Sequence, residues 1–153
     1  MVKKYVGIDP SMRLNGFAVC IIDENKVYFG KYKKLADWAK DALTWATDIV
    51  VVVEDSSLQN ITFRKYVDGR SRTKISRNVG MNQGASRFTI DWLELYGHTV
   101  KGISPQDKGS KWTLDYAMSV IKGMKLELTG NKKLSQDEID AFQLALIAKA
   151  YFK

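Results

Sequence analysis

The chain has 153 residues, of which 45% are hydrophobic and 27% are charged, and these values exclude a disordered or fibrous chain. A single cysteine excludes an internal disulfide framework, and no apolar run approaches the roughly eighteen residues of a membrane helix. From the length and these exclusions we expect one cytoplasmic domain over residues 1–153 that binds no membrane. The formal net charge of +7 favours a polyanionic partner.

The first half of the sequence predicts three strands, a helix and a fourth strand. Residues 4–8, 16–22 and 27–32 are expected to be strands, and the turn-forming segments between them indicate an antiparallel meander. Apolar residues recur every three or four positions over residues 35–46, which is typical of an amphipathic helix. Residues 49–53 form an unbroken β-branched run, which favours a central strand covered on both faces.

A long basic segment comes next. Residues 56–75 are polar and show no clear periodicity, so we interpret them as a long working loop. Residues 61–80 hold six basic residues and one acidic residue, a net charge of +5, which places much of the positive charge in one segment. The basic side chains expected to contact a polyanion are Arg64, Lys65, Arg70, Arg72, Lys74 and Arg77.

Two helices and a fifth strand are predicted after this segment. A helix over residues 76–96 is expected to end at Gly97, and residues 98–103 are expected to form the fifth strand. A loop then leads to a short helix over residues 112–122.

The last helix has a clear start signal. Ser135 and Glu138 match a capping box, so we expect the helix to begin at Gln136 and to run to the end of the chain. The order of elements as a whole predicts an α/β fold, with a five-stranded mixed sheet and helices on both of its faces.

Carboxylates follow two of the apolar strands. Asp9 comes directly after residues 4–8, and Glu54 comes directly after residues 49–53. If these strands are neighbours at the centre of the sheet, both acids reach the same edge. Each acid also has a structural interpretation, since an aspartate before Pro10 is common in turns and Glu54 could be a strand end that meets solvent.

Two more acids lie close together in the last helix. Asp137 and Asp140 are three positions apart and therefore share one face of that helix. Asp137 lies in the first turn, where an acid also complements the helix dipole. Asp140 lies beyond the first turn, on the edge of an apolar stripe, where a carboxylate is harder to explain structurally. Several carboxylates drawn into one place repel one another unless a divalent cation binds them.

An oxygen-only set of ligands selects Mg²⁺ or Mn²⁺ over zinc. A pair of such ions, about 3.5–4 Å apart in two-metal enzymes, activates a water molecule and stabilises the leaving oxygen of a phosphodiester. Together with the basic segment, the acids favour metal-dependent hydrolysis of a nucleic acid.

Three segments resemble the RuvC family of Holliday junction resolvases, and most closely the short resolvases of lactococcal bacteriophages. They are GIDPSMRLNGFAV at 7–19, VVVVED at 50–55 and DEIDAFQLAL at 137–146. The resemblance implies the RNase H-like fold of the retroviral integrase superfamily. It also implies a magnesium-dependent endonuclease that cleaves four-way junctions, forks and other branched DNA, in the cytoplasm of a host cell if a phage encodes it.

The resemblance also assigns roles to residues. It implies that four acids are catalytic and hold two Mg²⁺ ions, for which Mn²⁺ is expected to substitute: Asp9, Glu54, Asp137 and Asp140. It places the basic loop of the family on Lys108 and Lys111 as DNA contacts. The family dimerises through the helix after the long loop, which implies a homodimer interface at Gly80, Gly84 and Phe88; packing of these residues onto the sheet of their own domain is the alternative.

Two positions depart from the bacterial pattern. Ser11 replaces a glycine after Asp-Pro, and Ser57 stands where bacterial members carry an aromatic residue that stacks on a junction base. Phe63 or Tyr66 could take over that stacking, and we expect cleavage to select structure more than sequence. The sequence leaves open whether Asp55 supports the site or faces solvent.

Three other functions remain open at this stage. A YqgF-like nuclease of the same fold would act on structured RNA, and a non-catalytic module would bind nucleic acid without cutting it. An actin-like ATPase or sugar kinase is suggested by the likeness of residues 9–16 to a phosphate loop, but those enzymes need two such domains.

Overall fold

The computed structural model describes residues 4–10, 17–42, 49–58, 69–130 and 133–151. The predicted DNA contacts Arg64 and Lys65 lie outside these ranges, as do Ser11, Phe63 and Tyr66.

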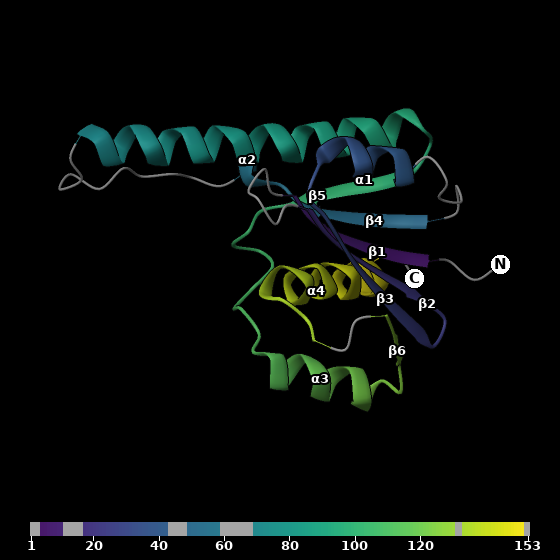
Figure 1. Ribbon diagram of the computed structural model, residues 1–153. Helices are drawn as coiled ribbons and strands as arrows, with labels where there is room; N and C mark the ends of the chain where they lie inside the picture. The colour runs from purple at the N-terminus through teal and green to yellow at the C-terminus, as the bar shows by residue number, and fades with distance from the viewer. Residues whose placement is uncertain (1–3, 11–16, 43–48, 59–68, 131–132, 152–153) are drawn as a thin grey trace.

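The centre of the described structure is a mixed sheet with the strand order β5-β4-β1-β2-β3-β6 (Figure 1). The first three strands form the predicted antiparallel meander, and β4 and β5 add to it in parallel beside β1. The bounds of the strands are β1 Lys4–Asp9, β2 Phe17–Asp23, β3 Lys26–Tyr32, β4 Ile49–Glu54, β5 Thr99–Ile103 and β6 Glu127–Thr129.

The predicted count of five strands is wrong, because the described sheet has six. The additional strand, β6, is only three residues long and pairs in parallel with the edge strand β3. Its sequence, Glu-Leu-Thr, is too short to show a strand period, and only Leu128 is partly buried. The pairing depends on contacts between segments remote in sequence, which a local pattern does not contain.

Helices cover both faces of the sheet, as predicted. α1 (Leu35–Ala42) and α2 (Gly69–Leu95) lie on one face, and α3 (Leu114–Gly123) and α4 (Gln136–Tyr151) lie on the other (Figure 1). A short 3₁₀ turn, η1 (Ser56–Leu58), follows β4.

The predicted loop over residues 56–75 needs correction, because α2 begins at Gly69. Arg70, Arg72, Lys74 and Arg77 therefore lie on a helix. In Figure 1 the N-terminal half of α2 extends past the sheet, so this half has no sheet face to cover and needs no apolar stripe. That explains why the segment lacks the periodicity by which a helix is recognised in a sequence.

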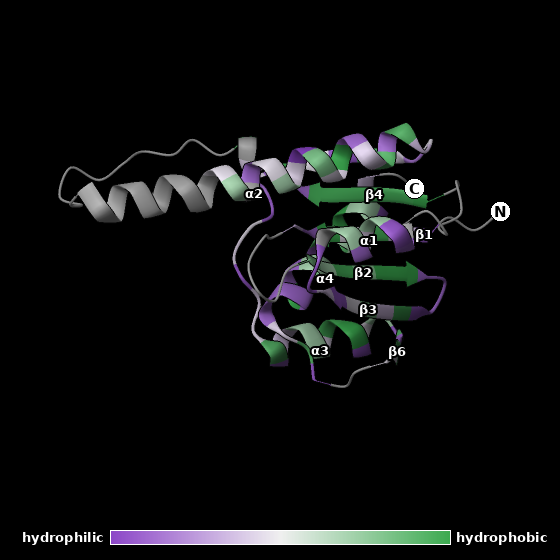
Figure 2. Ribbon diagram, turned by 45° about the horizontal axis from the view of Figure 1, so that its top comes forward, coloured by the Kyte–Doolittle hydropathy of each residue, from purple (hydrophilic) through white to green (hydrophobic). Residues whose placement is uncertain are grey.

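The alternation of side chains along the central strands produces two cores. In β4, Val51 and Val53 pack with residues of α1 and α2, whereas Val50 and Val52 pack with residues of α4. Figure 2 shows β2 and β4 as hydrophobic along most of their length. The prediction of a central strand buried on both faces is confirmed. None of the described helices combines the length and the apolar character needed to cross a bilayer.

α4 lies directly against β1 at Gly7. A Cβ atom at this position would overlap the Ala141 carbonyl oxygen and the Ala145 amide nitrogen and would lie 2.8 Å from the Leu144 Cβ atom. Glycine is the one residue that permits this distance between strand and helix. The contact fixes how far the acids of α4 stand from those of the sheet.

Candidate metal centre

The ends of β1 and β4 present two carboxylates to the same face of the sheet. The strands are parallel neighbours, and Ile8 pairs with Val53, so Asp9 and Glu54 follow at adjacent positions. Side chains alternate along a strand, so Glu54 shares the α4 face with Val52, and Asp9 shares that face with Gly7. The two acids therefore reach the same edge, as the sequence predicted.

The start of α4 brings the other two acids to this edge. The predicted capping box is confirmed: the Ser135 backbone N–H donates to Glu138 Oε1 at 3.1 Å, and the Glu138 N–H donates to Ser135 Oγ at 3.3 Å. This fixed start places Asp137 and Asp140 beside Asp9, and carboxylate oxygens of these three acids all lie within 4.8 Å of one another. The Glu54 side chain lies close enough to Asp9 to raise the pKa of that acid.

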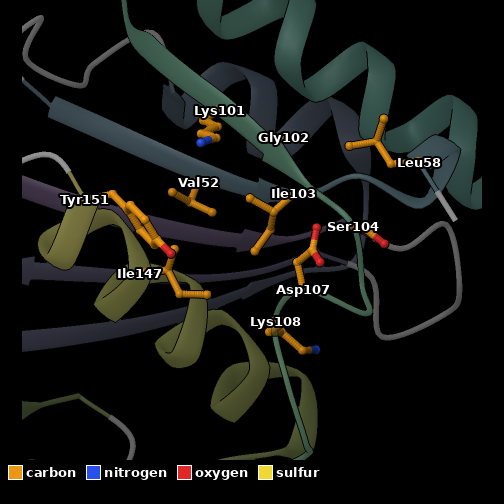
Figure 3. Close-up of a pocket in the computed structure, with 10 residues that line it drawn as sticks. All are labelled: Val52, Leu58, Lys101, Gly102, Ile103, Ser104, Asp107, Lys108, Ile147 and Tyr151. Carbon is orange, nitrogen blue, oxygen red and sulfur yellow. The ribbon is translucent and has the colours of Figure 1, made fainter.

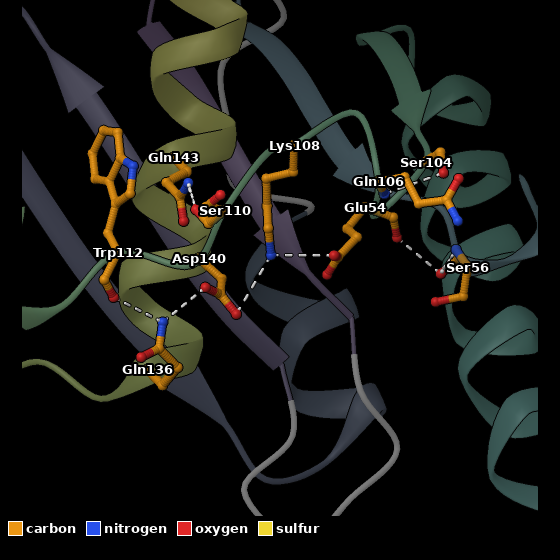
Figure 4. Close-up of polar contacts among 11 residues, drawn as sticks. Glu54, Ser56, Ser104, Gln106, Lys108, Ser110, Trp112, Gln136, Asp140 and Gln143 are labelled. Atoms are coloured by element: carbon orange, nitrogen blue, oxygen red, sulfur yellow. Dashed lines mark hydrogen bonds and ion pairs between the residues drawn. The ribbon is translucent and has the colours of Figure 1, made fainter. Parts of the chain in front are cut away.

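A lysine lies among these acids. Lys108 Nζ donates to Glu54 Oε1 at 3.2 Å and lies 3.5 Å from Asp140 Oδ2, so it joins β4 to α4 (Figure 4). Only 5% of the Lys108 side chain is exposed. Of the two lysines predicted to contact DNA from this loop, Lys108 is thus in the site. Lys111 is exposed and forms no ion pair with any residue that the structure describes.

Two glutamines of α4 hold the loop that carries Lys108. The Gln143 side-chain amide donates to the Ser110 carbonyl at 3.0 Å. The Gln136 amide donates to the Trp112 carbonyl at 3.3 Å and to Asp140 Oδ1 at 3.0 Å (Figure 4). Gln136 therefore fixes the loop and orients one carboxylate of the site.

Burial and mutual repulsion shift the ionisation of the site. Burial, followed by the hydrogen bond and the negative charge of Glu54, raises the pKa of Asp9 well above its ordinary value of 3.8. Burial alone would lower the pKa of Lys108, but the charges of Glu54, Asp140 and Asp9 outweigh it and the pKa is raised. The site thus gathers four acids around a single lysine, and the crowding favours the protonated form of Asp9.

We expect the metal-free Asp9→Asn protein to be more stable than the parent at neutral pH. Because folding raises the Asp9 pKa above 3.8, the folded state binds more protons, and stability falls as pH rises from 3.8 through the raised pKa. Asparagine at position 9 avoids this fall in stability, since it bears no charge beside Glu54 and Asp137. The midpoint of thermal unfolding in chelator at pH 7 should rise by about 2–4 °C, which is about 1 kcal/mol for a chain of this size. An unchanged or lower midpoint would contradict the assignment of Asp9 to a crowded acidic site.

α2 supports the Glu54 end of the site from the opposite face. The buried Ser86 hydroxyl donates to the Glu54 carbonyl at 3.0 Å and accepts from the Ser56 N–H at 3.3 Å. Asp55, which is 1% exposed, forms a 3.5 Å ion pair with Arg87. Asp55 therefore does not face solvent, and it interacts with α2 on the face opposite to the four acids.

Of the predicted dimer residues, Gly80 and Gly84 lie on an uncovered part of α2, whereas Phe88 makes an edge contact with Trp38 of α1, with 6.5 Å between ring centroids. A Cβ atom at Gly80 or Gly84 would meet no described atom within 4 Å. Phe88 is 38% exposed and stacks on Trp92, with 5.5 Å between ring centroids. The alternative of packing within the same domain is wrong for Gly80 and Gly84, but it holds in part for Phe88, whose ring meets Trp38 of the core.

Sequence reasoning missed the residues that support the site. Gln136 and Gln143 lie four positions before and three positions after Asp140, so they share its helix face and could have been found by that spacing. Ser86 carries no such signal, because Glu54 and Ser56, to which it hydrogen bonds, are thirty or more positions away in sequence.

The donor set suits a hard divalent cation. Three carboxylates within 4.8 Å of one another, with Glu54 beside them, offer only oxygen ligands. Mg²⁺ and Mn²⁺ prefer such ligands.

No family model matches the sequence, and no curated protein matches it. Among solved structures, the chain is similar to T. thermophilus RuvC in complex with a Holliday junction substrate, with a TM-score of 0.57 and 15% sequence identity. The match covers 97% of this chain and 94% of that chain. The chain has the RNase H-like α/β fold of RuvC, as predicted, and at this identity the likeness is one of fold.

Proposed function

We propose that the protein is a metal-dependent, structure-selective endonuclease that hydrolyses phosphodiester bonds in Holliday junctions and other branched DNA. The observation that carries the proposal is the convergence of Asp9, Asp137 and Asp140 within 4.8 Å, with Glu54 beside them. The RuvC-like fold supports it, since that neighbour was solved with a Holliday junction. From the resemblance of three sequence segments we also propose that it is a RuvC-type resolvase, similar to those of lactococcal bacteriophages.

In this proposal the four acids hold two Mg²⁺ ions, or Mn²⁺ in their place. When bound, such ions supply an activated water and stabilise the leaving oxygen. Asp9 and Glu54 provide ligands from the rigid sheet, and Asp137 and Asp140 provide them from α4. Gln136 keeps the Asp140 carboxylate turned into the site.

In this proposal basic side chains hold the DNA. We propose that Lys111 and Lys108 contact the phosphates next to the cleaved bond. We assign the flanking arms of the DNA to the long basic segment, which comprises Arg64, Lys65, Arg70, Arg72, Lys74 and Arg77. Phosphate contacts of this kind position the duplex without reading its sequence.

We also propose a homodimer through α2, because a junction that needs two symmetric nicks suits a two-fold enzyme. Gly80 and Gly84 leave room for the close approach of a second helix, and Phe88 lies exposed beside them. Light scattering at micromolar concentration should give about twice the chain mass of 17.4 kDa, and Gly84→Glu should give a monomer. Gly123→Glu, at another open helical glycine, is the control and should remain dimeric. A parent protein of monomer mass would refute this interface.

Cleavage of a panel of synthetic substrates tests the proposed function. The panel contains a four-way junction, a fork, plain duplex DNA and a folded RNA, each with Mg²⁺ or with chelator. The proposal expects Mg²⁺-dependent cuts in the junction and fork, and little cutting of the duplex. Preferential cutting of RNA would support a YqgF-like nuclease instead. Tight binding without cutting would support a non-catalytic module.

A further inference from the structure

We propose that Lys108 is an internal counterion of the acidic site, which divalent metal ions displace when they bind. The inference rests on the proposed metal-dependent function and concerns how the site changes on loading. It assigns Lys108 a role in setting metal affinity, in addition to any contact with DNA.

The Lys108 ammonium group lies between two carboxylates, as a metal ion bound by the site would. Lys108 Nζ lies 3.2 Å from Glu54 Oε1 and 3.5 Å from Asp140 Oδ2, and these two acids come from opposite sides of the site (Figure 4). The same two carboxylates are proposed as metal ligands. A lysine that bridges them neutralises part of the charge that would otherwise push β4 and α4 apart.

The Lys108 ammonium group and a divalent ion cannot both lie between Glu54 and Asp140. Two positive charges within a few ångströms repel strongly in a buried environment, where water screens them little. Metal binding therefore has to break at least one of the two ion pairs of Lys108. The affinity of the site for a metal ion is lowered by the free energy of that exchange.

The surroundings allow the side chain to move while the loop stays fixed. The backbone on either side is held, because the Asp107 N–H donates to the Ser104 carbonyl at 2.9 Å and the Ser110 carbonyl accepts from Gln143 at 3.0 Å. Lys108 borders two open cavities of about 460 and 290 Å³. The larger cavity is also lined by the polar groups Ser104 and Asp107 (Figure 3). A released ammonium group thus has open space into which it can move.

Calcium titration by calorimetry tests the exchange without catalysis. Ca²⁺ is a hard cation with oxygen ligands, so it serves as a probe of the same acids. Lys108→Met should bind Ca²⁺ about tenfold more tightly than the parent, because no ammonium has to be displaced. Lys122→Met, which removes an exposed lysine of α3, should bind like the parent. Equal or weaker binding by Lys108→Met would overturn the proposal.

A second measurement uses the unaltered protein and does not depend on whether a variant folds. Lysine acetylation by an amine-reactive reagent, followed by mass spectrometry, reports how accessible each ammonium group is. Lys108 should react slowly in chelator and several-fold faster when Ca²⁺ is added, whereas the exposed Lys122 of α3 should react alike in both. Ca²⁺ binding that leaves the Lys108 rate unchanged overturns the counterion role alone. The absence of any Ca²⁺ binding overturns the metal site, and with it the proposed function.

Discussion

Asp140→Asn should reduce Mg²⁺-dependent cleavage of a four-way junction by about 10³-fold, because a lost metal ligand forfeits several kcal/mol of transition-state stabilisation. Asp140 lies within ligand distance of Asp9 and Asp137 and bonds to both Gln136 and Lys108. Asparagine has the same shape and can still accept from Gln136, so the fold should survive. Rate constants under single-turnover conditions, together with junction binding in Ca²⁺, separate lost chemistry from lost binding.

The matched control for this variant is Asp115→Asn, an exposed acid in the first turn of α3. It removes the same charge from the protein without touching the site, so cleavage should stay near the parent rate. Two outcomes would count against the account: Asp140→Asn retaining cleavage within about tenfold of the parent, which is only about 1.4 kcal/mol, or losing its cooperative thermal transition.

Gly7→Ala adds a single methyl group, and we expect it to destabilise the fold more than any other glycine-to-alanine change in the sheet. Its Cβ atom would overlap backbone atoms of Ala141 and Ala145, which a change of rotamer cannot relieve. Overpacking of this kind costs about 3 kcal/mol, or roughly 6–12 °C in the unfolding midpoint of a chain of this size. Because α4 has to move away from β1, Asp137 and Asp140 should also separate from Asp9, and Ca²⁺ affinity should fall.

Gly30→Ala is the control for Gly7→Ala. Gly30 lies in β3 of the same sheet, and the nearest described atom to its added Cβ would be 3.8 Å away on Tyr32. Its unfolding midpoint should change by less than about 2–4 °C, or about 1 kcal/mol. Thermal melts in chelator provide the comparison. If both alanine variants melt within this range of the parent, the close contact between β1 and α4 does not determine the site.

The elements of the fold that could be predicted are those with a local signal in the sequence. The unbroken apolar run of β4 and the short turns of the meander are local signals, and both elements are present. The capping box at Ser135 is also local, and it fixed the start of α4. Strand β6 and the first turns of α2 were missed, because one depends on pairing with β3 and the other lies beyond the sheet.

The convergence of the four acids could also be predicted from local patterns. Asp9 and Glu54 each end an apolar strand, and Asp137 and Asp140 share a helix face, so strand parity and helix periodicity bring them together. The burial of Lys108 between Glu54 and Asp140 follows from the path of a loop. The hydrogen bonds of Ser86 depend on how α2 crosses β4. Neither the burial of Lys108 nor the hydrogen bonds of Ser86 can be predicted from the spacing of residues in the sequence.

Anomalous diffraction from crystals soaked in Mn²⁺ tests the central claim most directly. The account predicts two strong peaks about 3.5–4 Å apart, ligated by Asp9, Glu54, Asp137 and Asp140. Lys108 should then have left Glu54 or Asp140. Crystals in which Mn²⁺ binds elsewhere, or not at all, while the four acids stay within reach of one another, would contradict it.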